Sequence, residues 1–332
     1  MTDSTLSPTS HALADLAVEA WDGSLAAEPL NATALGDRRF LAQLRPNDAG
    51  ADDREIGRLR DLLDRTTALQ QAGLGPADRV TRRALIDNLA YELGVAESHI
   101  ASWSVDPLDG PQVQFLNLEA YQPIETPADG RAAVERWRAM GPWIDRHVDG
   151  IRVGMADGRV APRALIDKVV EELDDLLARP VETWPLAAPA AVDHPEWPAA
   201  ARRTFADDID AAIRVSIRPA FARLRAFLAE ALLGHARSND EPGLCRVPDG
   251  EAAYSSLVRA HTSLDLEPGA IHAIGLAEVA RIDGQFEELG RRILGTKDRS
   301  ATLDRLRTDP ELYFGTGAEV RAAAEAALAR AK

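Results

Sequence analysis

The chain has 332 residues, of which 45% are hydrophobic and 5% aromatic, and it carries a net charge of −15 at pH 7. This charge argues against a nucleic-acid partner and against an anionic membrane surface, because both require clustered basic residues. The single cysteine, Cys245, excludes an internal disulfide and any two-cysteine metal motif. The sequence has no membrane-spanning apolar run, and its first ten residues do not resemble a signal peptide, so we expect a soluble cytoplasmic protein.

Helix-forming residues dominate the composition, and the two-residue alternation of strands is nearly absent. The sequence therefore predicts an all-α fold, with long antiparallel helices in a bundle or array. The predicted helices cover residues 11–21, 52–71, 76–98, 127–153, 162–178, 199–235, 268–293, 300–307 and 318–329. Residues 101–126 hold several prolines among apolar residues, and we expect one long, irregular and partly buried loop there.

The length suggests about two domains or one large helical array. The segment 180–198 contains five prolines and two tryptophans, a composition typical of a linker. We therefore expect two helical subregions, 1–179 and 199–332, that this segment joins.

The most regular pattern in the chain follows Pro268, which suits the first position of a helix because its missing N–H needs no partner there. Glu267 before it is a poor N-cap. Apolar or small residues then recur in steps of three and four, which predicts one packed helix face. This face comprises His272, Gly275, Val279, Ile282, Phe286, Leu289 and Ile293.

His272 is the first candidate site residue. One interpretation is a core histidine with hydrogen-bonded ring nitrogens. The other is a pocket residue that lies near Tyr254 and His261 of the preceding helix. Glu278 and Arg281 are three residues apart, and we expect a local ion pair rather than an acid–base site.

The seven histidines include no H-E-x-x-H pair, which would place two imidazoles one helical turn apart on a zinc ion. A metal site in this chain would have to be assembled across helices. We expect neither a metal nor another cofactor in this chain.

Several segments resemble the N-terminal half of a large bacterial family, domain of unknown function 885. These are A-T-A-L-G-D-R-R-F at 32–40, the segment 123–137 with I-D-R-H-V-D-G-I-R-V-G-M-A-D-G-R-V-A-P at 144–162, P-D-G-E-A-A-Y at 248–254, T-S-L-D-L-E-P-G-A-I-H-A-I-G-L-A-E-V-A-R-I at 262–282 and D-P-E-L-Y-F at 309–314. The resemblance covers almost the whole chain but about half of the family's usual length.

The resemblance implies a largely helical, zinc-dependent peptidase of the gluzincin kind. The family's metal-binding motif, similar to H-E-x-x-x-G-H-H, lies downstream of the matched region, so zinc is expected only for the full-length family. No zinc ligand carries over to this chain, which we expect to be truncated before the metal-binding half. The alanine-rich run that ends at Lys332 has no glycine cap, which is consistent with a cut.

Three hypotheses follow. In the first, the chain is the helical N-terminal part of a peptidase-like hydrolase, forms part of a substrate channel wall for a peptide-like substrate, and is inactive alone. In the second, it is a non-catalytic helical binding protein that forms a homodimer through exposed helix faces. In the third, it is an independent enzyme that uses His272, His261 and Tyr254.

Overall fold

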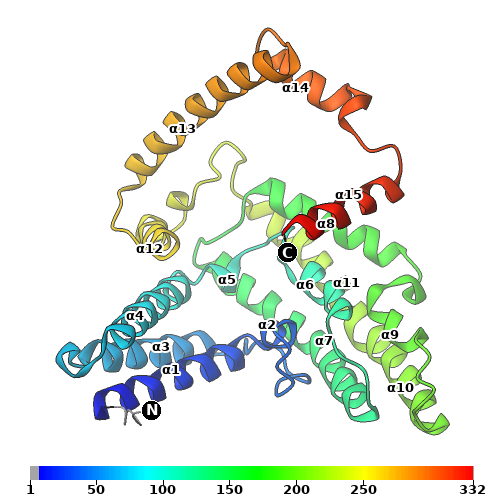
Figure 1. The fold of residues 1–332 in the computed structure, drawn as a ribbon. Helices are drawn as coiled ribbons and strands as arrows, with labels where there is room; N and C mark the ends of the chain where they lie inside the picture. Colours follow the sequence, from blue (N-terminus) through cyan, green and yellow to red (C-terminus); the bar gives the residue numbers. More distant parts are fainter. Residues whose placement is uncertain (1–6, 332) are drawn as a thin grey trace. The chain divides into compact units, whose positions relative to one another are not determined.

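The computed structural model describes residues 7–331, which are mostly helical (Figure 1). Within this range there is no β-strand, only an isolated bridge between Pro162 and Arg237. The all-α prediction is thus confirmed. The α-helices are α1 (Pro8–Ala27), α2 (Pro29–Ala34), α3 (Ala51–Ala68), α4 (Pro76–Glu97), α5 (Ile100–Trp103), α6 (Pro111–Asn117), α7 (Pro127–Ala156), α8 (Arg163–Ala178), α9 (Ala188–Ala191), α10 (Ala199–Ala211), α11 (Arg218–Ala226), α12 (Gly250–Thr262), α13 (Pro268–Leu289), α14 (Arg299–Thr308) and α15 (Gly317–Ala331).

The chain divides into two compact units, residues 1–265 and 266–332. The proline-rich segment 180–198 lies inside the first unit, so this division does not coincide with the predicted boundary between subregions. The prolines of this segment begin short helical turns instead of an extended linker. Its side chains Trp184 and Leu186 are buried, and the Trp137 indole nitrogen of α7 donates to the Leu186 carbonyl at 3.0 Å.

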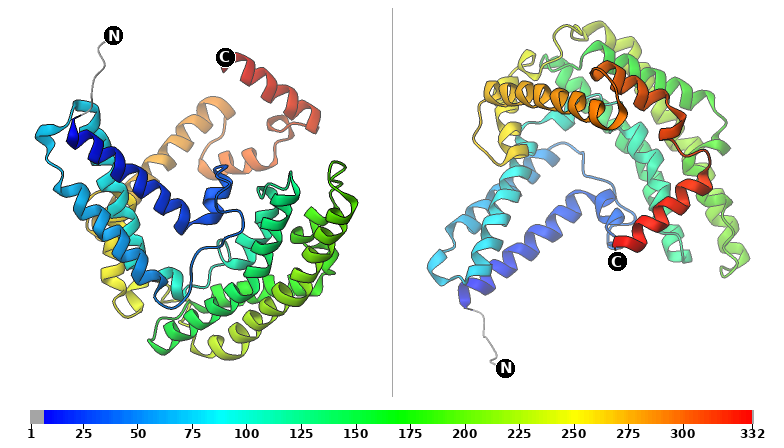
Figure 2. Two further views of the ribbon diagram at one scale, coloured as in Figure 1. Left: turned by 90° about the horizontal axis from the view of Figure 1, so that it is seen from below. Right: turned by 45° about the horizontal axis from the view of Figure 1, so that its top comes forward.

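Two groups of helices make up the first unit (Figures 1 and 2). In one group, α4 packs against α1, α3 and α12, around a small core that includes Leu59, Leu62 and Leu89. In the other group, α7 and α8 pack against the helical segments of residues 199–235. This second group surrounds a larger core whose fully buried residues include Trp137 and Phe221.

Residues 199–235 are helical from end to end, as predicted. Two π-helical segments, Ala212–Ile217 and Phe227–Leu232, interrupt the α-helical pattern. The first of these segments ends two residues before Pro219. Proline has no backbone N–H and so cannot donate a hydrogen bond within the helix. The wider π turn lets the helical backbone continue through the proline.

The segment predicted as one irregular and partly buried loop, 101–126, is partly buried as expected but more helical. It contains the end of α5 and all of α6, and Phe115 and Leu118 are buried in the large core. Pro111, one of the prolines of this segment, stands at the first position of α6, where a missing N–H is harmless.

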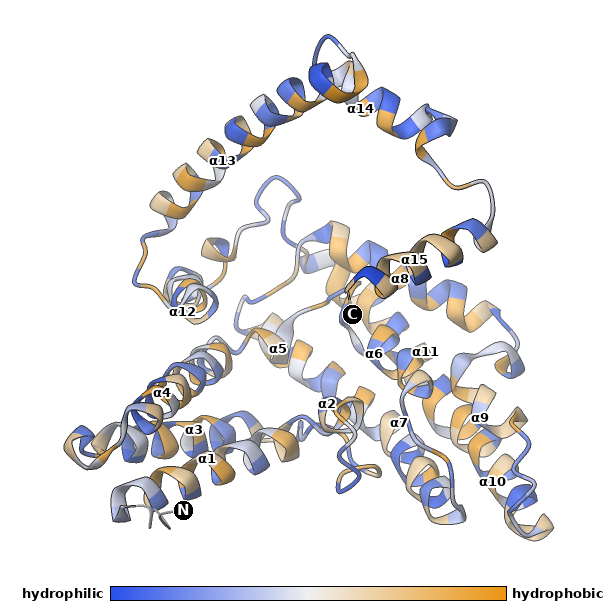
Figure 3. Ribbon diagram, viewed as in Figure 1, coloured by the Kyte–Doolittle hydropathy of each residue, from blue (hydrophilic) through white to orange (hydrophobic). Residues whose placement is uncertain are grey.

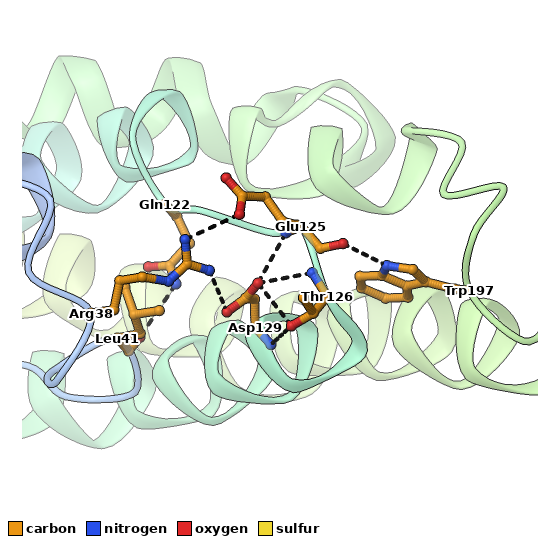
Figure 4. Close-up of polar contacts among 7 residues, drawn as sticks. All are labelled: Arg38, Leu41, Gln122, Glu125, Thr126, Asp129 and Trp197. Carbon is orange, nitrogen blue, oxygen red and sulfur yellow. Dashed lines mark hydrogen bonds and ion pairs between the residues drawn. The ribbon is translucent and has the colours of Figure 1, made fainter.

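The start of α7 is fixed by a capping box (Figure 4). The backbone N–H of Thr126 donates to the Asp129 carboxylate at 2.8 Å, and the Asp129 N–H donates to the Thr126 hydroxyl at 3.3 Å. Arg38 binds the other oxygen of Asp129 at 2.7 Å. The cap therefore also ties the loop after α2 to the start of α7.

A buried arginine reinforces this connection. Arg136 of α7 is fully buried and donates to the Thr33 hydroxyl at 3.0 Å, to the Gln122 side-chain oxygen at 2.6 Å, and to the carbonyls of Pro29 and Phe40. Burial lowers the pKa of Arg136 to about 10, a value at which the guanidinium is still charged at pH 7. The arginine thus holds α2 and the loop after it on α7.

The second unit consists of α13, α14 and α15. Glu267 makes no side-chain cap for α13, as predicted. The predicted packed face of α13 is exposed, however: His272 is exposed, Val279 is 56% exposed, and a side chain at Gly275 would meet open space. Figure 3 shows hydrophobic residues along both α13 and α15. The three-and-four spacing therefore predicted the helix correctly but not the burial of its apolar face.

Among the described residues, no helix combines the length and the apolar character needed to cross a membrane. Residues 1–6 and Lys332, on which part of the signal-peptide and truncation arguments rests, lie outside the described range.

Candidate ligand-binding cavity

The three site residues predicted from sequence do not form one site within either unit. Tyr254 and His261 both lie on α12 of the first unit, and the His261 ring contacts the Tyr91 ring edge-on at 5.5 Å. His272 lies on α13 of the second unit. The predicted local ion pair is present, since Arg281 binds Glu278 at 2.7 Å.

A cavity of about 800 Å³ lies in the first unit instead, well within the range of small-ligand sites. Most of its walls come from three segments: residues 44–53 before and at the start of α3, residues 99–115 around α5 and α6, and residues 143–159 of α7 and the turn after it. Glu28 and Leu30 at the start of α2 also line it. The cavity is thus built by segments far apart in the sequence that α7 brings together.

An aromatic stack lines one side of the cavity. Trp143 and His147, one turn apart on α7, stack with ring centroids 5.4 Å apart and planes inclined by 21°. The Phe115 ring of α6 meets the other side of Trp143 edge-on at 5.3 Å. All three side chains line the cavity and give it a flat, apolar surface.

Hydrogen bonds fix residues 45–47 to α7 beside this stack. The Trp143 indole nitrogen donates to the Arg45 carbonyl at 2.7 Å, and the Asn47 side chain donates to the Trp143 carbonyl at 2.9 Å. Arg146 in turn donates to the Asn47 side-chain oxygen at 2.8 Å. Because both Asn47 and its partners are held, this wall of the cavity is preorganised.

Two glycines of α7 allow α5 to lie directly on that helix. A Cβ at Gly150 would stand 2.7 Å from the Ser102 carbonyl oxygen, and a Cβ at Gly154 would overlap the Cβ of Trp103. Both glycines line the cavity together with Ser102 and Trp103. The glycine spacing of four residues thus positions α5 as a wall.

Carboxylates outnumber cationic side chains around the cavity. Eight aspartates and glutamates line it, against three arginines. Among them Asp53, Asp106 and Asp109 form no ion pair with any described residue. Burial raises the pKa of Glu28, and the cation of Arg45 opposes this effect only in part. The electrostatics of the cavity therefore favour a cationic ligand over an anionic one.

His147 is the titratable group most affected by its position in the cavity. Burial lowers its pKa to about 4, and no neighbouring charge or hydrogen bond contributes to this shift. The ring is therefore neutral at pH 7, so one nitrogen carries a proton and the other is a hydrogen-bond acceptor. A neutral imidazole in a cavity can accept a hydrogen bond from a ligand, or a proton from it.

A smaller cavity of about 430 Å³ adjoins the first one. His99, Trp103 and Arg159 line both of them, and the start of α12 closes the smaller one. Arg159 contacts Asp249 at 3.2 Å, and the Trp103 indole nitrogen is buried without a hydrogen-bond partner among the described residues. Trp103 therefore forms part of the wall of both cavities.

Sequence reasoning missed this site, although part of its signal was present. Trp143 and His147 are four residues apart, as are Gly150 and Gly154, so each pair lies on one helix face. The sequence could not indicate that Asn47 and its neighbours fold back onto that face.

The zinc that the family resemblance implies does not fit these residues. Within residues 7–331, no group of three or more histidine, cysteine, aspartate or glutamate side chains is arranged to hold a metal ion. We therefore assign no metal to the cavity and derive no chemical step through one.

The fold and the cavity define a helical protein with an acidic, aromatic-lined cavity. The chain belongs to the family described as "Bacterial protein of unknown function (DUF885)", whose model matches residues 29–332. This confirms the resemblance at the level of the family. Among curated proteins, none matches the chain.

One similar solved structure is the crystal structure described as "the putative lipoprotein from Colwellia psychrerythraea". The two share a TM-score of 0.77 at 17% sequence identity, over 92% of this chain and 55% of that one. At this identity the likeness shows the fold alone. The present chain thus spans about half the length of that structure.

Proposed function

We propose that this chain is the helical part of a peptidase-like hydrolase and that its cavity of about 800 Å³ binds the peptide-like substrate as part of the channel wall. The observation that carries the proposal is the cavity itself, with its rigid wall at Asn47 and its stacked Trp143 and His147. A flat aromatic surface suits the backbone and apolar side chains of a peptide, and the acidic rim adds preference for positive charge.

The catalytic centre of such a hydrolase would lie outside the residues described here. The chain alone is then expected to bind peptides without hydrolysing them. Stoichiometric zinc together with peptide turnover by the 332-residue chain would contradict this part of the proposal. The cytoplasmic location expected from the sequence stays a prediction, because a relative of the same fold is described as a lipoprotein.

The test is calorimetric titration with a blocked pentapeptide that contains one phenylalanine and one lysine. The variant Val153→Trp places an indole in the cavity at a side chain that is 63% exposed, so the core is untouched. Val215→Trp is the matched control, since Val215 is 79% exposed on another helical segment and does not line the cavity.

We expect the wild type and Val215→Trp to bind the peptide alike, and Val153→Trp to bind at least about tenfold more weakly, because the indole occupies ligand volume. Equal binding by all three proteins would place the peptide elsewhere, and no binding by any of them would refute the proposal.

A second candidate function is that of a helical interaction protein that forms homodimers. The observation in its favour is the row of exposed apolar residues on the second unit, including Val279, Leu289 and Phe314 at 56%, 42% and 60% exposure. Sedimentation of the wild type and of the Val279→Asp, Leu289→Asp double variant tests it. A dimer that the variant converts to a monomer would support this function, and a monomeric wild type would contradict it.

A further inference from the structure

His147 is a partly buried titratable residue of the cavity, and the proposed binding of a peptide uses its flat ring but not yet its ring nitrogens. Its ring stacks on Trp143, lines the cavity, and shows no hydrogen bond with any described residue. The residue is partly buried, and neither ring nitrogen is satisfied by the described part of the chain. The acceptor nitrogen of this ring is therefore available to a ligand.

The charges that line the same cavity indicate which ligand group would enter it. The carboxylates of Asp53, Asp106 and Asp109 line the same cavity and have no cationic partner among residues 7–331. A negative ligand group would be repelled by them, and a positive group would be attracted. The neutral ring adds no repulsion of its own, since burial keeps its pKa at about 4.

We propose that His147 accepts a hydrogen bond from a protonated amine of the bound ligand, so that the cavity selects peptides with a lysine side chain or a free amino terminus. This inference rests on the proposed function and adds a substrate class to it. The imidazole nitrogen orients the amine through a directional hydrogen bond. The carboxylates of the aspartates make the cavity prefer a positively charged group. The stacked ring of Trp143 covers one face of the imidazole and holds its orientation.

Three alanine-based probe peptides separate the sources of the amine. The first is blocked at both ends and contains lysine, the second is blocked and contains norleucine in its place, and the third contains norleucine and has a free amino terminus. Each is titrated calorimetrically into the wild-type chain, His147→Phe and His147→Gln. Phenylalanine keeps a flat ring over Trp143 but has no acceptor, whereas the glutamine side chain keeps one.

We expect at least one amine-bearing peptide to bind the wild type about tenfold more tightly than the blocked norleucine peptide, as for a hydrogen bond to a charged donor. Comparison of the lysine peptide with the free-amino peptide shows whether the cavity binds the amine of a lysine side chain or that of an amino terminus. His147→Phe should lose that preference, measured as the ratio of the affinities for the amine-bearing peptide and the blocked norleucine peptide. His147→Gln should retain part of this ratio.

Other results would overturn the inference in distinct ways. Equal affinity for all three peptides in the wild type would refute the selection of amines but leave the peptide site standing. A preference that survives unchanged in His147→Phe would assign it to the carboxylates alone. Equal weakening of every peptide in His147→Phe would make the residue structural, and failure of all peptides to bind the wild type would refute the proposed function as well.

Discussion

Acid titration of stability tests the burial of His147 quantitatively. Folding lowers its pKa from an ordinary 6.5 to about 4 because the ring is partly withdrawn from water. Since the folded value lies below the unfolded one, the unfolded chain takes up the proton first as the pH falls. The stabilisation that depends on a neutral His147 ring is therefore fully present above pH 6.5, and the free energy of unfolding loses it as the pH falls from 6.5 to 4. From pH 7.5 to pH 5.0 the linkage relation gives a loss of about 2 kcal/mol.

Urea unfolding at pH 7.5 and pH 5.0 measures this loss. The carboxylates of the chain also respond to pH, so the comparison is between the wild type and His147→Phe, which share them. We expect the free energy of unfolding of His147→Phe to fall by about 2 kcal/mol less than that of the wild type. His235→Phe, which replaces an exposed histidine, should behave as the wild type does. If the wild type and His147→Phe lose the same stability, the His147 ring is protonated in the folded chain and the reasoning fails.

Three further predictions concern the frame of the cavity and its charge. Arg136→Ala should lower the free energy of unfolding by about 3 kcal/mol in urea titration, because several buried acceptors lose their charged donor; a loss below 1 kcal/mol would contradict the role of this network. Gly154→Ala should destabilise the chain by about 1–3 kcal/mol through overlap with α5, whereas the control Gly57→Ala, a helical glycine with open space around it, should be neutral or stabilising. Asp53→Asn combined with Asp109→Asn should weaken calorimetric binding of the lysine peptide a few-fold at low salt, and unchanged affinity would exclude these carboxylates.

The helices whose ends carry local signals could be predicted closely from the sequence. The helix predicted at 76–98 is Pro76–Glu97, and the helix predicted to begin at 127 is Pro127–Ala156. In both cases a proline at the first position fixes the start, and Thr126 adds a capping box. These signals lie within a few residues of the helix end, so no tertiary information is required.

Prolines between helices were harder to interpret. The segment 180–198 has the composition of a linker, and in the structure its Trp184 is buried against the core formed by α7 and α11. A proline restricts its own backbone in the same way in a linker and in a short packed turn. What distinguishes the two is the burial of the tryptophans beside it, which depends on residues about fifty positions away.

The site itself required the tertiary structure. His272 has a regular apolar pattern around it, but the pattern cannot indicate whether another element covers that face, and here the residue is exposed. His147 lies in a polar segment, between Arg146 and Asp149, and its burial follows from Trp143 and the hydrogen-bonded loop at Asn47. Burial of this kind depends on contacts between segments about one hundred residues apart.

The most direct test of peptide binding in the cavity is hydrogen exchange of the backbone amides with and without the lysine peptide. The account predicts that saturating peptide slows exchange in residues 44–53, in residues 99–115 and at the end of α7, because these segments form the walls of the cavity. Exchange in α10 should not change. Protection that appears instead in α10 or in α13, with none at the cavity walls, would contradict the central claim.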